Sequence, residues 1–309
     1  MEIETVTDGL RFPEGPVALA DGSVLVVEIA AGRLTRVSPD GTKHVVATPG
    51  GGPNGAAMGP DGKIYVCNNG GFEFADDGGG RIRPYRQAWD YSGGRIERVD
   101  LETGAVEVLY RGTHDVPLKG PNDIVFDGHG GFYFTDLGKV RSRELDRGAV
   151  FYARADGSLV REVIFPMITP NGIGLAPDDR TLYVAETEAA RLWAFDILEP
   201  GVVSKEPFPS PHGGRLLAAP GGRYQRFDSL AVEADGRVCV ATLVHGGITI
   251  VDPASGSIEH VPMPDLFTTN ICFGSDELRT AWITLSHAGR LVACHWPRQG
   301  LALHHLNRG

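Results

Sequence analysis

The chain repeats one pattern of polar and apolar positions six times. Each copy begins with a polar residue, continues through a short apolar run and an acidic turn, and ends in a second apolar run. The copy at Pro121–Asp136 shows the pattern most clearly, with Asn122 before the run Ile124-Val125-Phe126 and the turn Asp127-Gly128 after it. Asp-Gly turns between apolar runs are typical of β-hairpins, because glycine adopts a positive φ without strain.

The polar residue at the start of each copy, called the head residue below, carries a side-chain oxygen in every copy. The head residues are Glu14, Asn54, Asn122, Asn171, Asp228 and Asn270. Most copies continue with a glycine turn and a third run such as Gly94–Val99, and several with a fourth run such as Val106–Leu109. Repeats of four strands and roughly 40–50 residues indicate propeller blades. We therefore predict an all-β fold, a six-bladed β-propeller of four-stranded antiparallel blades that forms a single domain over residues 1–309.

Three segments lie outside the repeats. Ile3–Thr7 precedes the first copy, and we expect it to complete the last blade as a strand beside the segment around Leu301–Leu306, so that the two ends of the chain close the ring. Residues 71–91 form a long insertion rich in aromatic residues and arginine. Such a composition favours an ordered lid or a partner contact over disorder. A second insertion, residues 200–222, is rich in proline and glycine and receives no predicted role.

The head residues are expected to converge on one axis. In a propeller the first strand of every blade lines the central channel, so equivalent positions in six blades face each other at one mouth. Asn and Asp are disfavoured within strands, which makes six oxygen-bearing heads notable. Two carboxylates among amide oxygens suit a hard divalent cation, and Ca²⁺ takes six to eight oxygen ligands. Mn²⁺, Mg²⁺, Zn²⁺ and Fe²⁺ are the alternatives, although the absence of His and Cys from the heads lowers the case for zinc.

A bound cation with an open coordination position would allow a reaction at this channel mouth. It polarises a carbonyl or phosphoryl oxygen and lowers the pKa of a bound water. A neighbouring carboxylate then acts as general base. Asp228, which is short and is followed by Ser229, is the predicted catalytic residue, and Glu14 is the predicted plain ligand.

The charge and composition of the chain limit the classes of partner that it can bind. The net charge of −10 argues against nucleic acid, which requires basic patches. No apolar window approaches the roughly 18 residues of a membrane span, and the N-terminus lacks the features of a signal peptide. The four widely spaced cysteines are expected to be free thiols. We expect a cytoplasmic protein that binds neither nucleic acid nor membrane, and no feature of the sequence indicates its oligomeric state.

Four phased motifs resemble one known family. They are Phe12–Pro16 (FPEGP), Pro121–Asp123 (PND), Pro170–Gly172 (PNG) and Asp228–Gly236 (DSLAVEADG). Together they resemble the SMP-30/gluconolactonase/regucalcin-like family, six-bladed propellers that include sugar lactonases, from about residue 10 to residue 296.

The resemblance implies one catalytic divalent metal held by Glu14, Asn171 and Asp228. It implies that Asn122 is a fourth ligand or, as in some members, a substrate contact. It also implies that Asp228 is the base or nucleophile. The related diisopropylfluorophosphatase group looks similar, with a Glu-Asn-Asn-Asp set about calcium.

The expected activity is hydrolysis of a lactone, either a sugar lactone or a small-acid lactone. Some sugar lactonases of the family carry Arg-x-Asn at the third head, where this chain has Gly120-Pro121-Asn122, so the resemblance leaves the lactone open. The candidate substrate-binding residues are the heads Asn54 and Asn270 together with Lys119 and His114 of the preceding loop. The alternatives are organophosphate hydrolysis at the same metal and a non-catalytic calcium-binding platform.

The second strand of each copy returns to the mouth where the heads lie. Its end carries Glu28, Asp136, Glu186 or His245 in four copies. These residues are expected either to support the heads or to be exposed at the rim.

Overall fold

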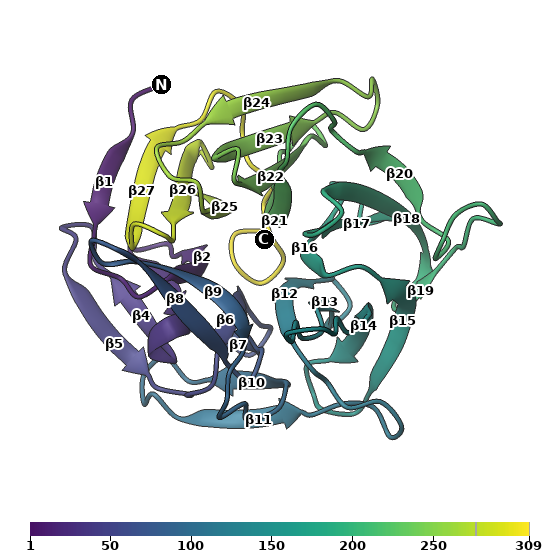
Figure 1. The fold of residues 1–309 in the computed structure, drawn as a ribbon, viewed down its shortest axis with the longest axis horizontal. Coiled ribbons are helices and arrows are strands. Elements are labelled where there is room, and N and C mark those ends of the chain that lie inside the picture. Colours follow the sequence, from purple (N-terminus) through teal and green to yellow (C-terminus); the bar gives the residue numbers. More distant parts are fainter. Residues whose placement is uncertain (276, 309) are drawn as a thin grey trace.

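A computed structural model describes residues 1–275 and 277–308. Six antiparallel sheets surround a central channel, which confirms the predicted six-bladed β-propeller (Figure 1). Among the residues described, no helix is long and apolar enough to cross a membrane.

The blades follow one another around the ring in chain order. Blade 1 contains β2 (Pro13–Ala18), β3 (Val24–Glu28), β4 (Arg33–Val37) and β5 (Lys43–Ala47), with the 3-10 turn η1 (Ile29–Ala31). Blade 2 contains β6 (Pro53–Met58), β7 (Ile64–Asn68), β10 (Arg95–Val99) and β11 (Val106–Tyr110). Blade 3 contains β12 (Pro121–Phe126), β13 (Gly131–Asp136), β14 (Gly148–Arg154) and β15 (Val160–Met167). Blade 4 contains β16 (Pro170–Leu175), β17 (Thr181–Glu186), β18 (Arg191–Glu199), β19 (Val202–Val203) and β20 (Arg215–Ala218). Blade 5 contains β21 (Arg226–Val232), β22 (Val238–Leu243), β23 (Gly247–Val251) and β24 (Ile258–Pro262).

Blade 6 is built from both ends of the chain. It contains β25 (Thr268–Gly274), β26 (Thr280–Leu285) and β27 (Arg290–His295), and β1 (Glu4–Thr7) pairs with β27 as its outer strand. The prediction that the N-terminal run completes the last blade is confirmed.

The predicted neighbour of that strand is wrong. Leu301–Leu306 does not flank β1 but lies across the end of the channel opposite the heads, where the C-terminus appears at the centre of Figure 1. The Leu301 N–H donates to the carbonyl of Val232, and His304 contacts Asp179 at 3.0 Å. The physical reason is that Leu301 and Leu303 cover the apolar end of the channel opposite the heads, which would otherwise face water.

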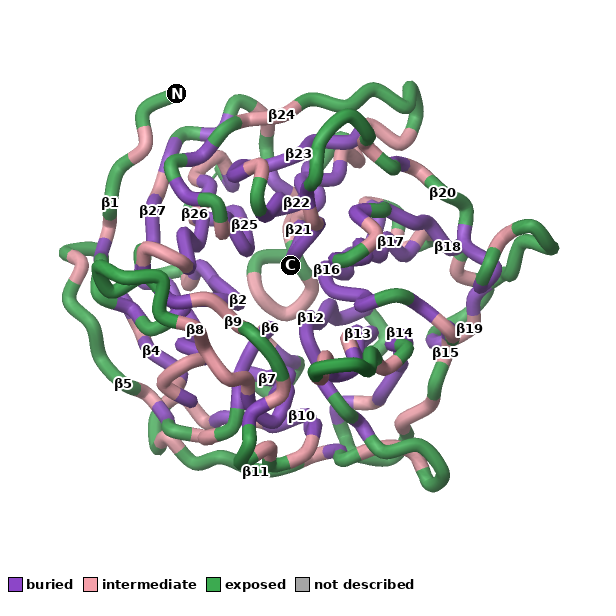
Figure 2. Tube along the Cα trace, in the orientation of Figure 1, coloured by how far each residue is buried: buried purple, intermediate pink, exposed green. Residues whose placement is uncertain are grey.

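Buried aromatic side chains fill the spaces between neighbouring blades. Tyr65 of blade 2 packs edge-on against Phe126 and Phe132 of blade 3, with ring centroids 5.0 and 5.6 Å apart. Figure 2 shows the same trend around the ring, with buried residues in the inner strands and exposed residues along the outer ones. Fully burying one such side chain contributes about 1.5–3 kcal/mol. These contacts fix each blade, and therefore each head, relative to the next.

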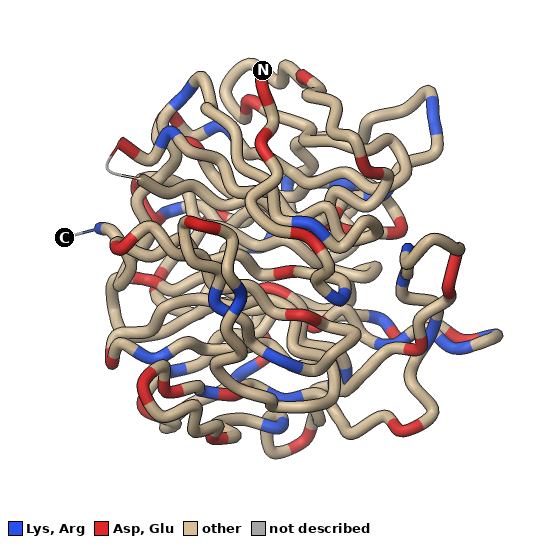
Figure 3. The backbone as a smooth tube through the Cα atoms, turned by 90° about the vertical axis from the view of Figure 1, so that its left-hand side faces the viewer, with Lys and Arg blue, Asp and Glu red and all other residues tan. Residues whose placement is uncertain are grey.

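Charged residues follow the outside of the ring. In the side view of Figure 3, Lys and Arg positions are interspersed with Asp and Glu positions along the chain. Mixed signs of this kind keep a surface solvated without one dominant field.

The first insertion is an ordered β-hairpin outside the blades. β8 (Phe72–Gly78) pairs with β9 (Arg81–Gln87), and the hairpin extends from blade 2 across blade 1 (Figure 1). Phe74 packs against Phe12 of blade 1 with centroids 5.4 Å apart, and Asp77 near the tip contacts His287 of blade 6 at 3.1 Å. The order predicted for residues 71–91 is confirmed.

Candidate active site

A β-bulge occurs at the head of every blade. In blade 3 the first strand advances three residues, from Pro121 to Ile124, while its partner advances two, from Asp136 to Phe134. The other five inner strands have the same single extra residue at their heads. A bulge bends the strand and redirects the side chains at that point. The repeated bulge therefore aims the heads into the channel.

Five of the six heads line one cavity at the channel mouth. The cavity has a volume of about 150 Å³, and its head residues are Glu14, Asn54, Asn122, Asn171 and Asp228. All five are buried. The sixth head, Asn270, borders the adjoining inner cavity and donates from Nδ2 to Oε2 of Glu14 at 2.7 Å.

The two head carboxylates stand in an environment that penalises their charge. Burial raises the pKa of Glu14, although Asn270 and the Gly15 N–H both donate hydrogen bonds to it. Burial likewise holds the pKa of Asp228 well above its ordinary value, and the charge of Glu14 adds to the effect. Two buried carboxylates in one cavity are both ionised only when a cation compensates their charge, and otherwise a proton is retained.

The amide heads present oxygens to the same space. Oδ1 of Asn122 is buried and has no hydrogen-bond partner among residues 1–275 and 277–308. Asn171 donates from Nδ2 to the Thr187 hydroxyl at 3.0 Å, and its Oδ1 lies 3.5 Å from the Ser229 hydroxyl. An unpaired buried acceptor costs about 1–3 kcal/mol, which calls for an unseen partner.

This donor set fits a hard cation. Carboxylate and amide oxygens are the groups that calcium and magnesium prefer. The described part of the chain has no cluster of three or more His, Cys, Asp or Glu side chains suited to a metal. Any ion held at this mouth would therefore depend on the amide oxygens as well as on Glu14 and Asp228.

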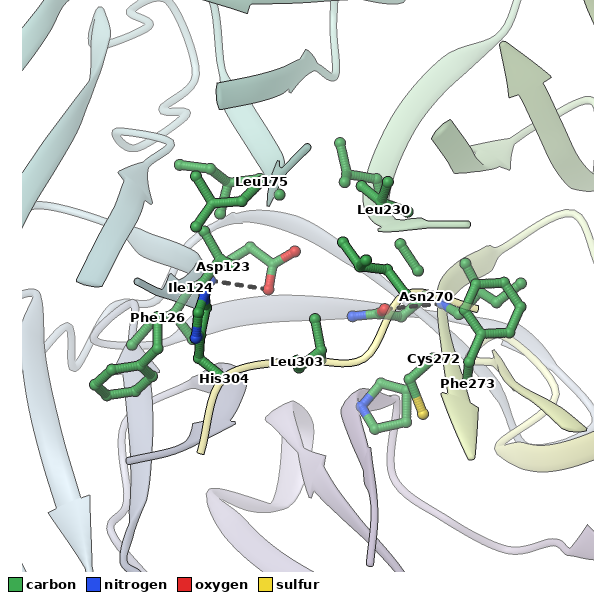
Figure 4. Close-up of a pocket in the computed structure, with 18 of the residues that line it drawn as sticks. Asp123, Ile124, Phe126, Leu175, Leu230, Asn270, Cys272, Phe273, Leu303 and His304 are labelled. Carbon is green, nitrogen blue, oxygen red and sulfur yellow. Dashed lines mark hydrogen bonds between the residues drawn. The ribbon is translucent and has the colours of Figure 1, made fainter. Parts of the chain in front are cut away.

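A third carboxylate, Asp123, was not identified from the sequence. It is buried directly after the head Asn122, and its Oδ1 accepts the Ile124 N–H at 3.0 Å. Burial raises the pKa of Asp123 to about 8, with a further contribution from the charge of Glu14. Asp123 and Asn270 point into the inner cavity from opposite sides, above Leu303 (Figure 4). The sequence feature that could have identified Asp123 is the acidic residue directly after a head. A β-bulge turns two successive side chains to the same side of the strand, so both reach the channel.

Glycines follow the heads where neighbouring blades come closest. A Cβ at Gly55 would lie 2.4 Å from the carbonyl oxygen of Asn122, and one at Gly172 would lie 2.6 Å from that of Asp228. No side chain fits at such distances. The head-glycine pairs therefore allow adjacent heads to approach each other around the channel.

Two of the predicted substrate-binding residues lie elsewhere. Lys119 forms an ion pair with Asp146 at 2.8 Å and is half exposed, while His114 projects into solvent beside Asp115. Neither lines the cavity of the heads. Their role in substrate binding stays a prediction, as does that of Asn54 and Asn270.

The walls of the cavity come partly from the insertion 71–91, which the sequence favours as a lid or a partner contact, and partly from residues that the sequence did not single out. They are mainly apolar, with two arginines at the rim. The apolar and aromatic members are Phe12, Ile29, Phe72, Pro84, Tyr85, Leu137, Val140, Leu243 and Phe267. Arg226 pairs with Glu188, and Arg86 with Glu73. The hairpin supplies Phe72, Pro84, Tyr85 and Arg86, so it acts as a lid on the mouth.

The acidic ends of the second strands support the heads. Glu28, Asp136 and Glu186 are buried, and each accepts backbone N–H groups from the loop that leads into the head of its own blade. The donors are Arg11 for Glu28, Lys119 and Gly120 for Asp136, and Ile168 for Glu186, at 2.7–2.8 Å. His245 differs, because it stacks on the ring of His260 with centroids 3.7 Å apart.

The chain is similar to known proteins over most of its length. Residues 12–287 match the model of the SMP-30/Gluconolactonase/LRE-like region. The chain is 28% identical over 265 residues to Lactonase drp35 of Staphylococcus saprophyticus, a match that covers 85% of this chain and 72% of that protein. It is 26% identical over 320 residues to Gluconolactonase of Zymomonas mobilis, covering 92% and 79%.

Solved structures share the fold. A gluconolactonase of Xanthomonas campestris superimposes with a TM-score of 0.73 at 22% identity, covering 96% of this chain and 89% of that one. The calcium-binding protein regucalcin of Agrobacterium tumefaciens superimposes with a TM-score of 0.75 at 18% identity, covering 100% and 98%. At these identities the likeness concerns the propeller alone. Because the family match extends from the first head into the last blade, the chain belongs to the SMP-30/Gluconolactonase/LRE-like family.

Proposed function

We propose that this protein is a divalent-metal-dependent hydrolase that opens lactones at the channel mouth. The observation that carries the proposal is the buried, unpartnered Oδ1 of Asn122 in the same cavity as Glu14 and Asp228. The names of the lactonase and gluconolactonase relatives favour the same reaction class.

Glu14, Asn122, Asn171 and Asp228 would hold the metal, for which Ca²⁺ is the first choice. When bound, such an ion polarises the lactone carbonyl and stabilises the negative charge that develops on its oxygen. Glu14 accepts two hydrogen bonds from within the channel, which suits a fixed ligand. Asp228 borders the rim formed by Arg226 and Glu188, which suits a group that meets substrate.

In this reading Asp228 directs a water molecule at the carbonyl carbon and accepts its proton. The ring C–O bond then breaks, the leaving oxygen takes this proton from Asp228 and becomes an alcohol, and the product is a hydroxy acid. Asn54 and the walls orient the lactone ring, and the hairpin limits the entry of bulk water.

The apolar walls also favour a second candidate. Phe72, Tyr85 and Phe267 would suit the organic groups of a phosphotriester, whose P=O oxygen can be polarised at the same site. A non-catalytic calcium-binding platform is the third alternative.

One experiment separates these functions. Purified protein is assayed against aldonolactones, aliphatic and aromatic lactones, and a phosphotriester. Each assay is run with the protein as purified, with the protein after chelation, and with the chelated protein reloaded with Ca²⁺, Mn²⁺, Mg²⁺ or Zn²⁺. We expect lactone turnover that chelation abolishes and one metal restores. Unchanged rates after complete metal removal would contradict the proposal, turnover of the phosphotriester alone would favour the second candidate, and stoichiometric metal without any turnover would favour the platform.

A further inference from the structure

A buried lysine lies beside the lid hairpin, outside the channel. Lys139 is only 1% exposed. Its Nζ donates to the carbonyls of Asn69 at 2.8 Å and Gly71 at 2.9 Å. The same atom lies 4.0 Å from the ring centroid of Phe72 and 5.1 Å from that of Tyr91. Two carbonyls and two aromatic faces therefore surround the ammonium.

The buried site of Lys139 is unfavourable for its positive charge unless the carbonyl and aromatic groups around the ammonium stay in place. Burial lowers the pKa of Lys139 to about 7, against the opposing effect of Asp136 and Asp146. A buried ammonium is tolerated only where hydrogen bonds replace its water. Each of its contacts is therefore important to the local structure.

All of these contacts lie at the root of the hairpin. Phe72 begins β8 directly after Gly71, and the carbonyl of Val140, next to Lys139, accepts the N–H of Gln87, which ends β9. Both strands are thus fastened to one short segment around Lys139. Leu137 and Val140 of this segment face the cavity, so the segment is both the anchor of the hairpin and part of the wall.

Beyond its root the hairpin packs on blade 1 through Phe74, which contacts Phe12, and through Ile82, which is buried in the same apolar cluster. Near the tip, Asp77 contacts His287. Glu73, Asp77, Arg83 and Arg86 pair with one another on the exposed surface, where ion pairs contribute little. These ion pairs therefore add little to the placement of the lid, which depends on its root and on the apolar contact with blade 1.

We propose that Lys139 is a positioning residue for the reaction at the channel mouth, because its ammonium holds the β8–β9 hairpin in place as the roof of the substrate cavity. The reaction itself rests on the proposed function, whereas the placement of the hairpin does not. Lys139 does not line the cavity, so it acts through Phe72, Pro84 and Tyr85 on the hairpin. Loss of the ammonium should weaken substrate binding and leave the metal ligands on the blades unchanged.

The first test uses Lys139→Met, which keeps the apolar stem and removes the charge. The hairpin reports on its own placement through trypsin, which cuts after Arg81 and Arg86, while Pro84 protects the bond after Arg83. We expect cleavage at Arg81 and Arg86 to become about 10-fold faster or more, because a released hairpin opens more often. Lys63→Met, which removes a surface lysine from the β6–β7 turn, is the matched control and should leave cleavage unchanged. Equal cleavage of the Lys139→Met variant and the native protein would overturn the proposal, whether or not any lactone is turned over.

The second test separates positioning from a general structural effect. In the Lys139→Met variant we expect KM for the lactone to rise about 10-fold and kcat to change less than about 3-fold. Calcium affinity, measured by calorimetry without substrate, should stay the same. Lys139→Arg keeps donors for both carbonyls and should restore KM at least in part. If KM rose further in Lys139→Arg than in Lys139→Met, the side chain would have a packing role, and the proposal would be overturned.

A shortened hairpin completes the design. Replacing residues 72–87 by Gly-Gly removes the roof, including Phe72, and keeps the carbonyls of Asn69 and Gly71 around Lys139. If Lys139 acts through the hairpin, adding Lys139→Met to this shortened chain should raise KM no further. A full additional effect there would refute the proposal. If Lys139→Met does not fold, Lys139→Gln, which also removes the charge but keeps a donor, takes its place, and a native KM and cleavage rate in that variant would count equally against the proposal.

Discussion

The side-chain amide of Asn270 donates a 2.7 Å hydrogen bond to the carboxylate of Glu14 and thereby joins the last blade to the first inside the channel. The bond is buried, and Oδ1 of Asn270 in turn accepts the Ile271 N–H at 2.8 Å. Asn270 is thus fixed by its own blade and fixes Glu14 in the next.

Replacing Asn270 by alanine should weaken metal binding. Groups that orient a metal ligand typically contribute 10–100-fold in affinity, so we expect a loss of about that size in Ca²⁺ affinity by calorimetry. Asn270→Asp should be at least as harmful, because it removes the donor and adds a further carboxylate. Unchanged affinity in both variants would show that Glu14 is positioned without Asn270.

Asp228→Asn should remove most of the activity and leave the fold intact. The amide can still offer an oxygen to a cation but cannot accept a proton, and general-base catalysis contributes about 10²–10⁴-fold. The measurement is kcat on the best lactone of the panel, with the melting temperature as a check on folding. Asp235→Asn, in the exposed turn of the same blade, is the control and should retain full activity. An active Asp228→Asn variant would exclude Asp228 as the base.

The channel carboxyls should make the metal-free protein less stable as pH rises. Burial raises the pKa of Asp123 to about 8 and also raises those of Glu14 and Asp228. Each group binds its proton more tightly when folded. It therefore stabilises the fold below its unfolded pKa of about 4, and this contribution is lost as pH rises through the folded pKa.

The measurement is the melting temperature between pH 5 and about pH 8. Chelated protein should melt at progressively lower temperature as pH increases. Saturating Ca²⁺ should reduce the decline, because the cation replaces the protons. Asp123→Asn should flatten the profile of the chelated protein. A melting temperature that climbs with pH in the chelated protein would contradict the assignment of these raised pKa values.

Asp136→Asn should destabilise blade 3 and impair the site together. The carboxylate accepts the N–H groups of Lys119 and Gly120 at 2.7 Å and that of Gly138 at 2.9 Å. An asparagine keeps one acceptor oxygen and brings an amide that cannot accept, so we expect a loss of about 1–3 kcal/mol in the free energy of unfolding. Activity should fall as well, since the loop leads directly to Asn122. Denaturant titration and kcat/KM test both effects, and a variant with native values in each would show that the loop is held by other contacts.

Removal of residues 2–7 should destabilise the whole ring. β1 pairs with β27 through Glu4, Thr5 and Thr7, and the Thr7 hydroxyl donates to the carbonyl of Gly41 in blade 1. The lost hydrogen bonds contribute about 2–4 kcal/mol in sum. The deletion also exposes β27 as an edge that can pair with other chains. We expect a lower melting temperature and aggregation near it, detected by light scattering, and an unchanged melting temperature would show that blade 6 is complete without β1.

The number of blades, the positions of the heads and the role of the N-terminal strand were predictable from the sequence. Each depends on local signals that recur at regular spacing, such as Asp-Gly turns between apolar runs. A repeat of this kind constrains topology strongly, since each unit must bury its faces against its neighbours. The set of heads followed because equivalent positions in a closed ring face one axis.

The composition of the cavity was decided by tertiary structure. The bulge at each head brings Asp123 to the channel beside Asn122, although simple alternation along a strand would place adjacent side chains on opposite faces. The hairpin covers the mouth because its root is fastened near Lys139, 68 residues after Gly71 in the chain. The C-terminal segment crosses the far end of the channel because apolar side chains there require cover. These outcomes depend on contacts between residues distant in sequence, which periodicity and spacing do not encode.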